Sequence, residues 1–426
     1  MKTILTFCFT VLIFTGKFFA QWNMLFAPQT STLSLGVNCI SAPDVNVMWA
    51  STFDTTNTQS STLFYKTNDG GISWAINSIN TAPAMQIVSI SAINKDTAWA
   101  AINKIGTGVS ISLFFSKVLK TTDGGANWTQ QTTASYTGPK NHINFIKFMD
   151  EPHGLCVEDS HPGCWEIYKT FNGGTNWHRI PSTNILANLT GEKGIENCYS
   201  VYNNTIWFGT NKGRIYKSID FGNSWNTYTT PISNISNISM KDSLNGLASN
   251  GTTLIKTNDG GITWFVQPYN GVLFSADLCF MTGHPNSYGS CGWKSGDRGS
   301  SYTIDDGLNW ITIDSIRHTT LDFTSYSEWS GGVTWIAADT QKYLFFYNNL
   351  QHVTGTFPIK KNDEIKIYPN PFSNELNFVK NKKLESITIE MYNALGLLVN
   401  KWTGQQEDIM KIHTESLEKG TYIFKT

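Results

Sequence analysis

The sequence predicts an all-β protein: a seven-bladed β-propeller followed by a small C-terminal antiparallel β-sandwich. Three observations support this fold class. A turn motif recurs along most of the chain, short strand patterns separate its copies, and the composition is poor in charge. Of the 426 residues, 15% are charged, 13% are aromatic and 35 are Gly. Few charges with many Gly and aromatic residues are typical of short strands joined by tight turns.

The first twenty residues have the pattern of a secretory signal peptide. Lys2 precedes an apolar run at 4–14, and Ala20 is a small residue before the expected mature start at Gln21. The apolar run is short for a membrane span. We therefore expect residues 1–20 to direct export to the periplasm, and the mature chain to have no transmembrane segment.

The cysteines and the charge limit the classes of partner. Export permits disulfides, and Cys156 and Cys164 flank a turn-like sequence, so we favour a disulfide between them and leave the other four mature Cys open. No Cys/His spacing is typical of a metal site, and we expect no cofactor. The net charge of −1 gives no electrostatic case for a nucleic-acid partner.

The turn motif is the main architectural signal. The strings KTNDGGISW (66–74) and KTNDGGITW (256–264) differ at one position. Four relatives occupy 120–128, 169–177, 217–225 and 302–310, so that successive copies lie 39 to 54 residues apart. A period in this range predicts repeated four-stranded units, which are propeller blades.

The shared pattern is Ser/Thr-x-Asp-x-Gly-x-x-Trp, with Asn in one copy. We expect the Asp carboxylate to accept hydrogen bonds from backbone N–H groups one or two residues on, the Gly to take a positive φ, and the Trp ring to pack beneath the turn. The motif residues are therefore interpreted as structural. They are Asp69, Gly71, Trp74, Asp123, Gly125, Trp128, Asn172, Gly174, Trp177, Asp220, Gly222, Trp225, Asp259, Gly261, Trp264, Asp305, Gly307 and Trp310.

Strand patterns complete the units. Three short strands precede each motif and a fourth follows it. A seventh unit, between 318 and 347, lacks the motif and an outer strand, whereas 21–28 reads like the segment that follows each motif. We therefore expect the first mature strand to complete the last blade, which would remove an open sheet edge. The predicted propeller spans 21–347.

These motifs resemble the Asp-box (BNR-type) repeats of sialidases, sortilin-like receptors, xyloglucan-degrading propellers and photosystem II assembly-factor-like proteins. The resemblance covers about 21–347. It implies that each box lies on the outer, lower side of its blade, away from a binding face. It specifies no activity.

The C-terminal part is a separate module. Residues 348–364 are polar and read as a linker, and 365–426 contain alternating strand patterns. Three phrases, YPNPF, IEMYNALGLLV and LEKGTYIFKT, resemble the type A sorting domain of the type IX secretion system of Bacteroidetes. The resemblance implies the type IX machinery as a partner and a secreted or outer-surface location. The matched residues are Tyr368, Pro369, Asn370, Pro371, Asn393, Gly396, Leu417, Gly420 and Tyr422.

The biochemical task is less determined. Loops between second and third strands and between blades would form one rim, whose mixture of polar residues and an aromatic suits a glycan or a surface protein. We therefore expect a non-catalytic binding propeller. The rim candidates are Lys104, Asp159, His161, Trp165, Lys212, Lys294, Asp297 and Arg298.

The alternative is an extracellular glycoside hydrolase that acts on a polysaccharide through paired carboxylates in the central cleft. The loop carboxylates available for such a pair are Asp54, Asp159, Asp297 and Asp339. Nothing around them distinguishes them from solvated loop residues.

Overall fold

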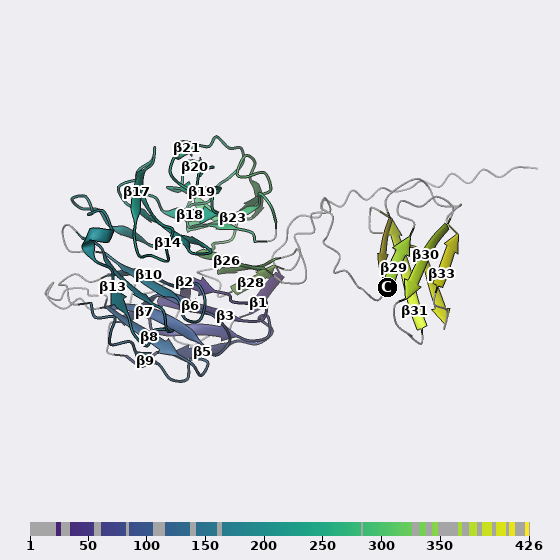
Figure 1. Ribbon diagram of the computed structural model, residues 1–426, viewed down its shortest axis with the longest axis horizontal. Coiled ribbons are helices and arrows are strands. Elements are labelled where there is room, and N and C mark those ends of the chain that lie inside the picture. Colours follow the sequence, from purple (N-terminus) through teal and green to yellow (C-terminus); the bar gives the residue numbers. More distant parts are fainter. Residues whose placement is uncertain are drawn as a thin grey trace, which may run out of the picture. The chain divides into compact units, whose positions relative to one another are not determined.

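The computed structural model places two units of the chain, Met1–Val353 and Thr354–Thr426, which are described here separately (Figure 1). The expected signal peptide and linker lie outside the described residues. The structure describes residues 23–26, 35–54, 61–81, 85–104, 116–136, 142–159, 164–282, 284–325, 332–337, 343–347, 365–368, 375–380, 386–393, 398–405, 409–413 and 422–425.

Six antiparallel four-stranded sheets, here blades 1 to 6, are each formed by four consecutive strands. Blade 1 contains β2 (Leu35–Ser41), β3 (Met48–Asp54), β4 (Leu63–Thr67) and β5 (Ala75–Ser78). Blade 2 contains β6 (Met85–Ala92), β7 (Ala98–Lys104), β8 (Ser116–Thr121) and β9 (Thr129–Gln130). Blade 3 contains β10 (Ile143–Phe148), β11 (Gly154–Glu158), β12 (Glu166–Thr170) and β13 (His178–Arg179).

A 3₁₀ helix, η2 (Ser182–Asn184), leads from blade 3 to blade 4. Blade 4 contains β14 (Gly194–Tyr202), β15 (Thr205–Thr210), β16 (Arg214–Ser218) and β17 (Asn226–Thr229). Blade 5 contains β18 (Asn237–Met240), β19 (Gly246–Ser249), β20 (Leu254–Thr257) and β21 (Phe265–Val266). Blade 6 contains β22 (Asp277–Phe280), β23 (Tyr288–Lys294), β24 (Asp297–Thr303) and β25 (Ile311–Asp314).

The remaining sheet of this unit, here the closing sheet, combines both ends of the unit. It pairs β26 (Thr320–Ser325), β27 (Gly332–Ala337) and β28 (Tyr343–Tyr347) with β1 (Asn23–Phe26), and Asn23 lies opposite Phe346. The structure thus has six blades of consecutive strands rather than the seven expected. The seventh sheet differs because it has no turn motif and draws its outer strand from the N-terminal end.

The first strands of these sheets contact one another in a closed cycle: β2, β6, β10, β14, β18, β22, β26 and back to β2. The core lies between adjacent sheets rather than within one. One cluster combines Trp49 and Phe64 of blade 1 with Ile87 and Ile90 of blade 2. A closed ring of twisted sheets with its core between neighbours is the β-propeller architecture.

The turn motif has one geometry, which corrects the expected hydrogen bonding. In the first copy the Asp69 carboxylate accepts from the backbone N–H of Ser73, four residues on, at 2.9 Å, not from residues one or two on. The Thr67 hydroxyl links the strand to the turn, because it donates to Asp69 at 2.8 Å and accepts from Gly71 N–H at 2.9 Å. Gly71 has φ 86°, as expected.

The other copies repeat this bond from four residues on. The acceptors are Asp123, Asn172, Asp220, Asp259 and Asp305. The bond from the Asn127 amide lowers the pKa of exposed Asp123 to about 2. Because the Asn172 amide oxygen accepts in the same way at 2.9 Å, the motif needs an oxygen acceptor rather than a charge.

The motif Trp packs between blades. Trp128 of blade 2 meets Trp49 and Phe64 of blade 1 edge-on, at centroid distances of 6.3 and 5.7 Å. Its indole N–H donates to the Gly125 carbonyl at 3.2 Å, and four other copies share this bond. The Trp177 indole, which is buried, has no such partner. In blades 2 to 6 the motif Trp therefore also packs in the core shared with the preceding blade.

A Lys opens five of the six motifs, and in blades 1 and 2 it donates to the motif of the next blade. Lys66 lies over the Trp49 ring, 4.4 Å from its centroid, and donates to the Gly124 carbonyl of the next motif at 3.1 Å. Lys120 lies over Trp99 and reaches Gly173 at 2.8 Å. Burial lowers the pKa of both Lys. The sequence motif contains this Lys, but its contact with the next blade could not be read from one repeat.

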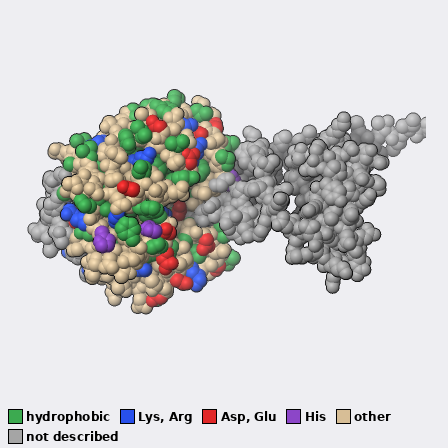
Figure 2. All heavy atoms as spheres, viewed as in Figure 1, with side chains coloured by type: hydrophobic (Ala, Val, Ile, Leu, Met, Phe, Trp, Pro, Cys, Tyr) green, Lys and Arg blue, Asp and Glu red, His purple; other side chains and the backbone are tan. Residues whose placement is uncertain are grey.

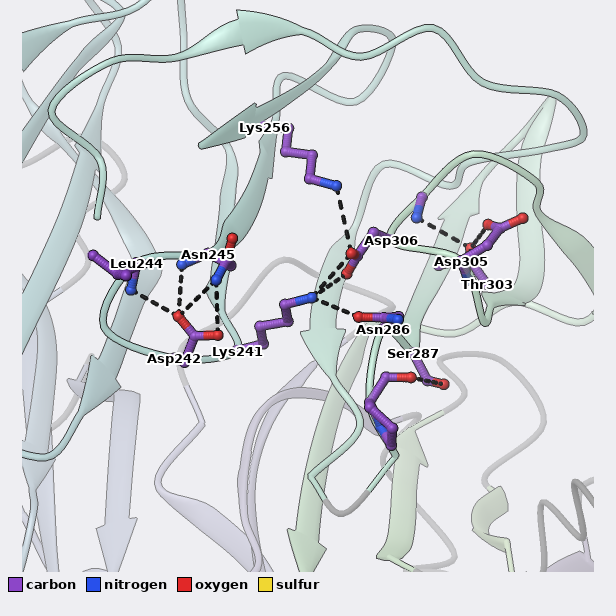
Figure 3. Close-up of polar contacts among 12 residues, drawn as sticks. Lys241, Asp242, Leu244, Asn245, Lys256, Asn286, Ser287, Thr303, Asp305 and Asp306 are labelled. Atoms are coloured by element: carbon purple, nitrogen blue, oxygen red, sulfur yellow. Dashed lines mark hydrogen bonds and ion pairs between the residues drawn. The ribbon is translucent and has the colours of Figure 1, made fainter. Parts of the chain in front are cut away.

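Between blades 5 and 6 a carboxylate replaces that carbonyl. Asp306 stands where four other motifs have Gly, with φ 57°, and its side chain accepts from Lys256 at 3.4 Å. Lys241 also donates to Asp306, at 2.7 and 2.9 Å, and to Asn286 at 2.6 Å (Figure 3). This interface is therefore joined by a small charged network.

The C-terminal unit contains two three-stranded antiparallel sheets. Its strand β31 carries the buried side chains of Ile389 and Met391, two residues apart as expected for one face. One sheet contains β29 (Ile365–Tyr368), β30 (Glu375–Lys380) and β33 (Ile409–His413), and the other contains β32 (Leu398–Gln405), β31 (Ser386–Asn393) and β34 (Tyr422–Lys425). Of the expected sorting residues, Pro369, Asn370, Pro371, Gly396, Leu417 and Gly420 lie outside the described residues.

The motif geometry predicts the cost of removing one Trp. Trp264 is 8% exposed and its indole donates to the Gly261 carbonyl at 3.1 Å. Trp264→Ala should therefore lower the free energy of unfolding by about 3–5 kcal/mol, as measured by urea denaturation. Trp293, which is 38% exposed, is the matched control, and Trp293→Ala should cost under about 1 kcal/mol. Equal losses would contradict a structural role specific to the motif.

Candidate functional site

The predicted rim residues do not form one site. Lys212 is exposed on the tight turn after β15, whereas Lys294, Asp297 and Arg298 lie at the β23–β24 turn of blade 6. Asp159 is half-buried and joins blades 3 and 4, because it accepts from Asn144 at 2.9 Å and from Gly194 N–H at 2.7 Å. Lys104, at the end of β7, is half-buried, and His161 lies outside the described residues.

Trp165 was the predicted aromatic of the rim, and this interpretation is wrong. It is 1% exposed and packs edge-on against Phe208 and Tyr216 at about 5 Å. Because Phe208 and Tyr216 belong to blade 4, Trp165 fills the core between blades 3 and 4. In the equivalent turn of blade 6, Trp293 is exposed, and its register partner is Arg298. Position next to a turn could not distinguish these two Trp residues.

The favoured disulfide is also not formed. Cys156 and Cys164 are both free. The Cα partner of Cys156 across the hairpin is Tyr168, four residues beyond Cys164. Four residues of extended chain span about 13 Å, whereas bridged Cys have Cα atoms within about 7 Å. The turn is therefore longer than a facing pair of cysteines would require.

A central cavity of about 220 Å³ is the strongest candidate site, and it lies among the first strands of the sheets. Side chains from β2, β10, β14, β18, β22 and β26 line it. The loop carboxylates Asp159 and Asp297 are not among them, and the side chains of Asp54 and Asp339 lie outside the described residues. The carboxylates that do line the cavity are Asp277 and Asp322.

One position of each first strand defines a ring, and six of its seven residues line this cavity. These residues, here the ring residues, share the same backbone register, because each is paired with the equivalent residue of its second strand. They are Ser41, Ser91, Lys147, Ser200, Ser239, Cys279 and Asp322. Their partners are Trp49, Trp99, Leu155, Trp207, Leu247, Gly289 and Trp335.

The ring residues bond each sheet to its neighbour. Ser41 accepts from the backbone N–H of Ala92 in the next blade at 3.0 Å, and Ser91 accepts from Phe148 at 2.9 Å. Ser200 and Ser239 accept in the same way from blades 5 and 6. Asp322 accepts from Ala42 N–H at 2.8 Å and so joins β26 to blade 1. Lys147 departs from this pattern, because an ammonium group cannot accept a hydrogen bond.

The two cavity carboxylates are engaged by backbone. Asp277 accepts from Leu321 N–H at 2.8 Å and from the Thr320 hydroxyl at 2.9 Å, so both bonds come from β26. Burial raises the pKa of Asp277, and burial raises the pKa of Asp322 to about 6 while the Lys147 ammonium opposes that shift. Groups that hold neighbouring strands are poorly suited to move protons during hydrolysis. The geometry therefore does not favour the glycoside hydrolase alternative.

The described residues also show whether the requirements of a metal site, a membrane span or a charged patch are met. Among residues with described placement, no three His, Cys, Asp or Glu side chains are grouped as metal ligands. In that same part of the chain, no helix has the length and apolar character needed to cross a membrane. On the face shown in Figure 2, basic and acidic side chains are interspersed among many uncharged ones.

The ring predicts an unusual pH dependence. Asp322 has a pKa of about 6 in the fold and about 3.9 in an unfolded chain, so the folded state binds the proton more tightly. The stability from this protonation is full below pH ~4 and is lost as pH rises through about 6. Asp322→Ser keeps an acceptor for Ala42 and removes the charge. Relative to wild type, this variant should gain about 2 kcal/mol in urea unfolding between pH 4 and 7.

Asp242→Ser is the control of opposite sign. Although burial opposes it, hydrogen bonds from the Asn245 side chain and from the Leu244 and Asn245 amides lower the pKa of Asp242 (Figure 3). Wild-type Asp242 therefore stabilises the fold above its unfolded pKa, and this variant should lose stability relative to wild type as pH rises. A pH profile of Asp322→Ser parallel to wild type would contradict the assignment.

Comparisons with known proteins support the two-part organisation. Residues 366–426 match the family described as a secretion system C-terminal sorting domain. YCF48 from Cyanidioschyzon merolae is similar with a TM-score of 0.53 and 18% identity, over 77% of this chain and 99% of that one. A structure described as YCF48 bound to D1 peptide gives a TM-score of 0.52 and 16% identity, over 77% and 95% of the two chains.

The RRP9 WD40 repeats are also similar, with a TM-score of 0.53 and 8% identity, over 77% of this chain and 97% of that one. No curated protein matches the chain. At these identities the structural likeness establishes the fold alone. The chain therefore combines a β-propeller with a C-terminal sorting domain of the type IX secretion system, which implies secretion or a cell-surface location.

Proposed function

We propose that this protein is a non-catalytic binding propeller, exported by the type IX system, that recognises a glycan or a surface protein outside the cell. The match of 366–426 to a sorting domain carries the export part of this proposal. A signal peptide at 1–20 would provide the first step into the periplasm. The resemblance of the motifs to Asp-box repeats and of the C-terminal phrases to Bacteroidetes sorting domains is consistent with it.

The closing sheet acts as the seventh blade, since β26 completes the contact cycle between β22 and β2. The two sheets of the C-terminal unit pack as a sandwich around Ile389 and Met391. A propeller closed in this way holds its surface loops rigidly, which suits binding.

The blade 6 turn is the most suitable recognition surface. Trp293 is exposed beside Lys294 and Arg298, and Asp297 is register partner to Lys294. An exposed indole offers a flat apolar surface with a polar edge, and its cationic neighbours add hydrogen-bond donors. Such a surface suits a sugar ring or a protein loop. The similar propeller described with a bound D1 peptide is a reason to include peptides in a screen.

Binding can be tested with the mature full-length chain on glycan arrays and in pull-downs of cell-surface proteins. Trp293→Ala should weaken binding of any ligand at this surface by tenfold or more, because it removes the exposed apolar contact. Phe265→Ala, on the outer strand of blade 5, removes a comparably exposed aromatic and should leave binding unchanged. Polysaccharide turnover without retained binding would instead support the hydrolase.

Export has its own test. Deleting 365–426 should leave the propeller in the periplasm and remove it from the cell surface and medium, as measured by fractionation and immunoblotting. The control is a deletion of equal extent restored by the sorting domain of another type IX substrate, which should recover export. Secretion of the deleted chain at wild-type levels would contradict a sorting role for this unit.

A further inference from the structure

Lys147 is the ring residue whose side chain cannot form the hydrogen bond that joins neighbouring sheets elsewhere in the ring. At five interfaces a ring residue accepts a backbone N–H from the next sheet. At the interface of blades 3 and 4 the position that would accept from Val201 N–H is occupied by Lys147, which has no acceptor. The Lys147 ammonium and the Val201 N–H are therefore both donors, whereas each of those five interfaces pairs a donor with an acceptor.

Both donors border the central cavity. Lys147 and Val201 line it together with Asp322 from the closing sheet. The Lys147 ammonium and the Asp322 carboxylate influence each other electrostatically but are not in ion-pair contact. Among the described side chains, Lys147 forms no hydrogen bond or ion pair. The cavity thus places the Lys147 ammonium in the same space as the carboxylates of Asp277 and Asp322.

The remaining lining limits the size and shape of a ligand. The volume of about 220 Å³ is below the range of about 300–1,000 Å³ typical of drug-sized sites. Phe280, Met240 and Leu278 add apolar surface to the lining. The side-chain oxygen of Asn197, which also borders the cavity, is buried without a partner. A buried polar atom of this kind normally acquires a hydrogen bond from water or a ligand.

We propose that the central cavity binds a small zwitterion of the α-amino acid class. Its carboxylate accepts hydrogen bonds from the Lys147 ammonium and Val201 N–H, and its ammonium group lies against the Asp322 carboxylate. The ligand supplies the acceptor that the blade 3–blade 4 interface lacks. This site is separate from the blade 6 surface and carries no covalent chemistry.

The test uses calorimetric titration of the mature full-length chain with glycine and alanine, and with acetate and methylamine as single-charge fragments. Lys147→Ser places at this position the residue that four other first strands carry, so it should fold and complete the ring. It should lose amino acid binding by tenfold or more. Lys212→Ser removes an exposed Lys of blade 4, and Trp293→Ala alters the proposed recognition surface, and both should bind as wild type.

The outcomes separate the alternatives. If the wild-type protein binds the amino acids at least tenfold more tightly than it binds either fragment, the result supports a site for a dipolar ligand. Equal affinity for acetate, absence of binding at millimolar concentration, or binding retained by Lys147→Ser would overturn the proposal. Should the serine variant fail to fold by circular dichroism, Lys147→Gln, which is one bond shorter than Lys and uncharged, takes its place and has the same expected loss.

Discussion

The hydrogen bond from one sheet's backbone to the ring side chain of the preceding sheet is the constraint on which this propeller depends. Each first strand is the inner edge of its sheet, so the N–H groups on its cavity side have no neighbouring strand to bond and need another acceptor. Serine provides one at four positions and Asp322 provides one at the point of closure. The outer turns add a second set of links, in which Lys66 and Lys120 reach the neighbouring motifs.

The cavity and the surface consequently have different chemistry. Around the cavity, the carboxylates of Asp277 and Asp322 join neighbouring sheets, because each accepts a hydrogen bond from a backbone N–H of an adjacent sheet. At the turn of blade 6, by contrast, Trp293, Lys294 and Arg298 are exposed. In propellers the sheets commonly provide a rigid scaffold, and the loops that they hold provide the binding residues.

The architecture could be predicted because its signals are local and repeated. Gly71 and Trp74 recur with fixed spacing, so the turns and strands between them followed directly. The candidate site could not, because it is made by single residues from separate blades. Ser41 and Asp322 are equivalent only through strand register, which the sequence does not display. Trp165 and Trp293 likewise flank similar turns, and only tertiary packing separates the buried one from the exposed one.

The pairing of β1 with β28 has a consequence for how the chain folds in time. Asn23 and Phe346 are about 320 residues apart in sequence, so their contact can form only after nearly the whole propeller has been synthesised. A ribosome-bound chain can assemble individual blades but not the finished circle. The unit thus stays open-ended until the residues of β28 have left the ribosome, and its first strand must wait without its sheet partner for most of synthesis.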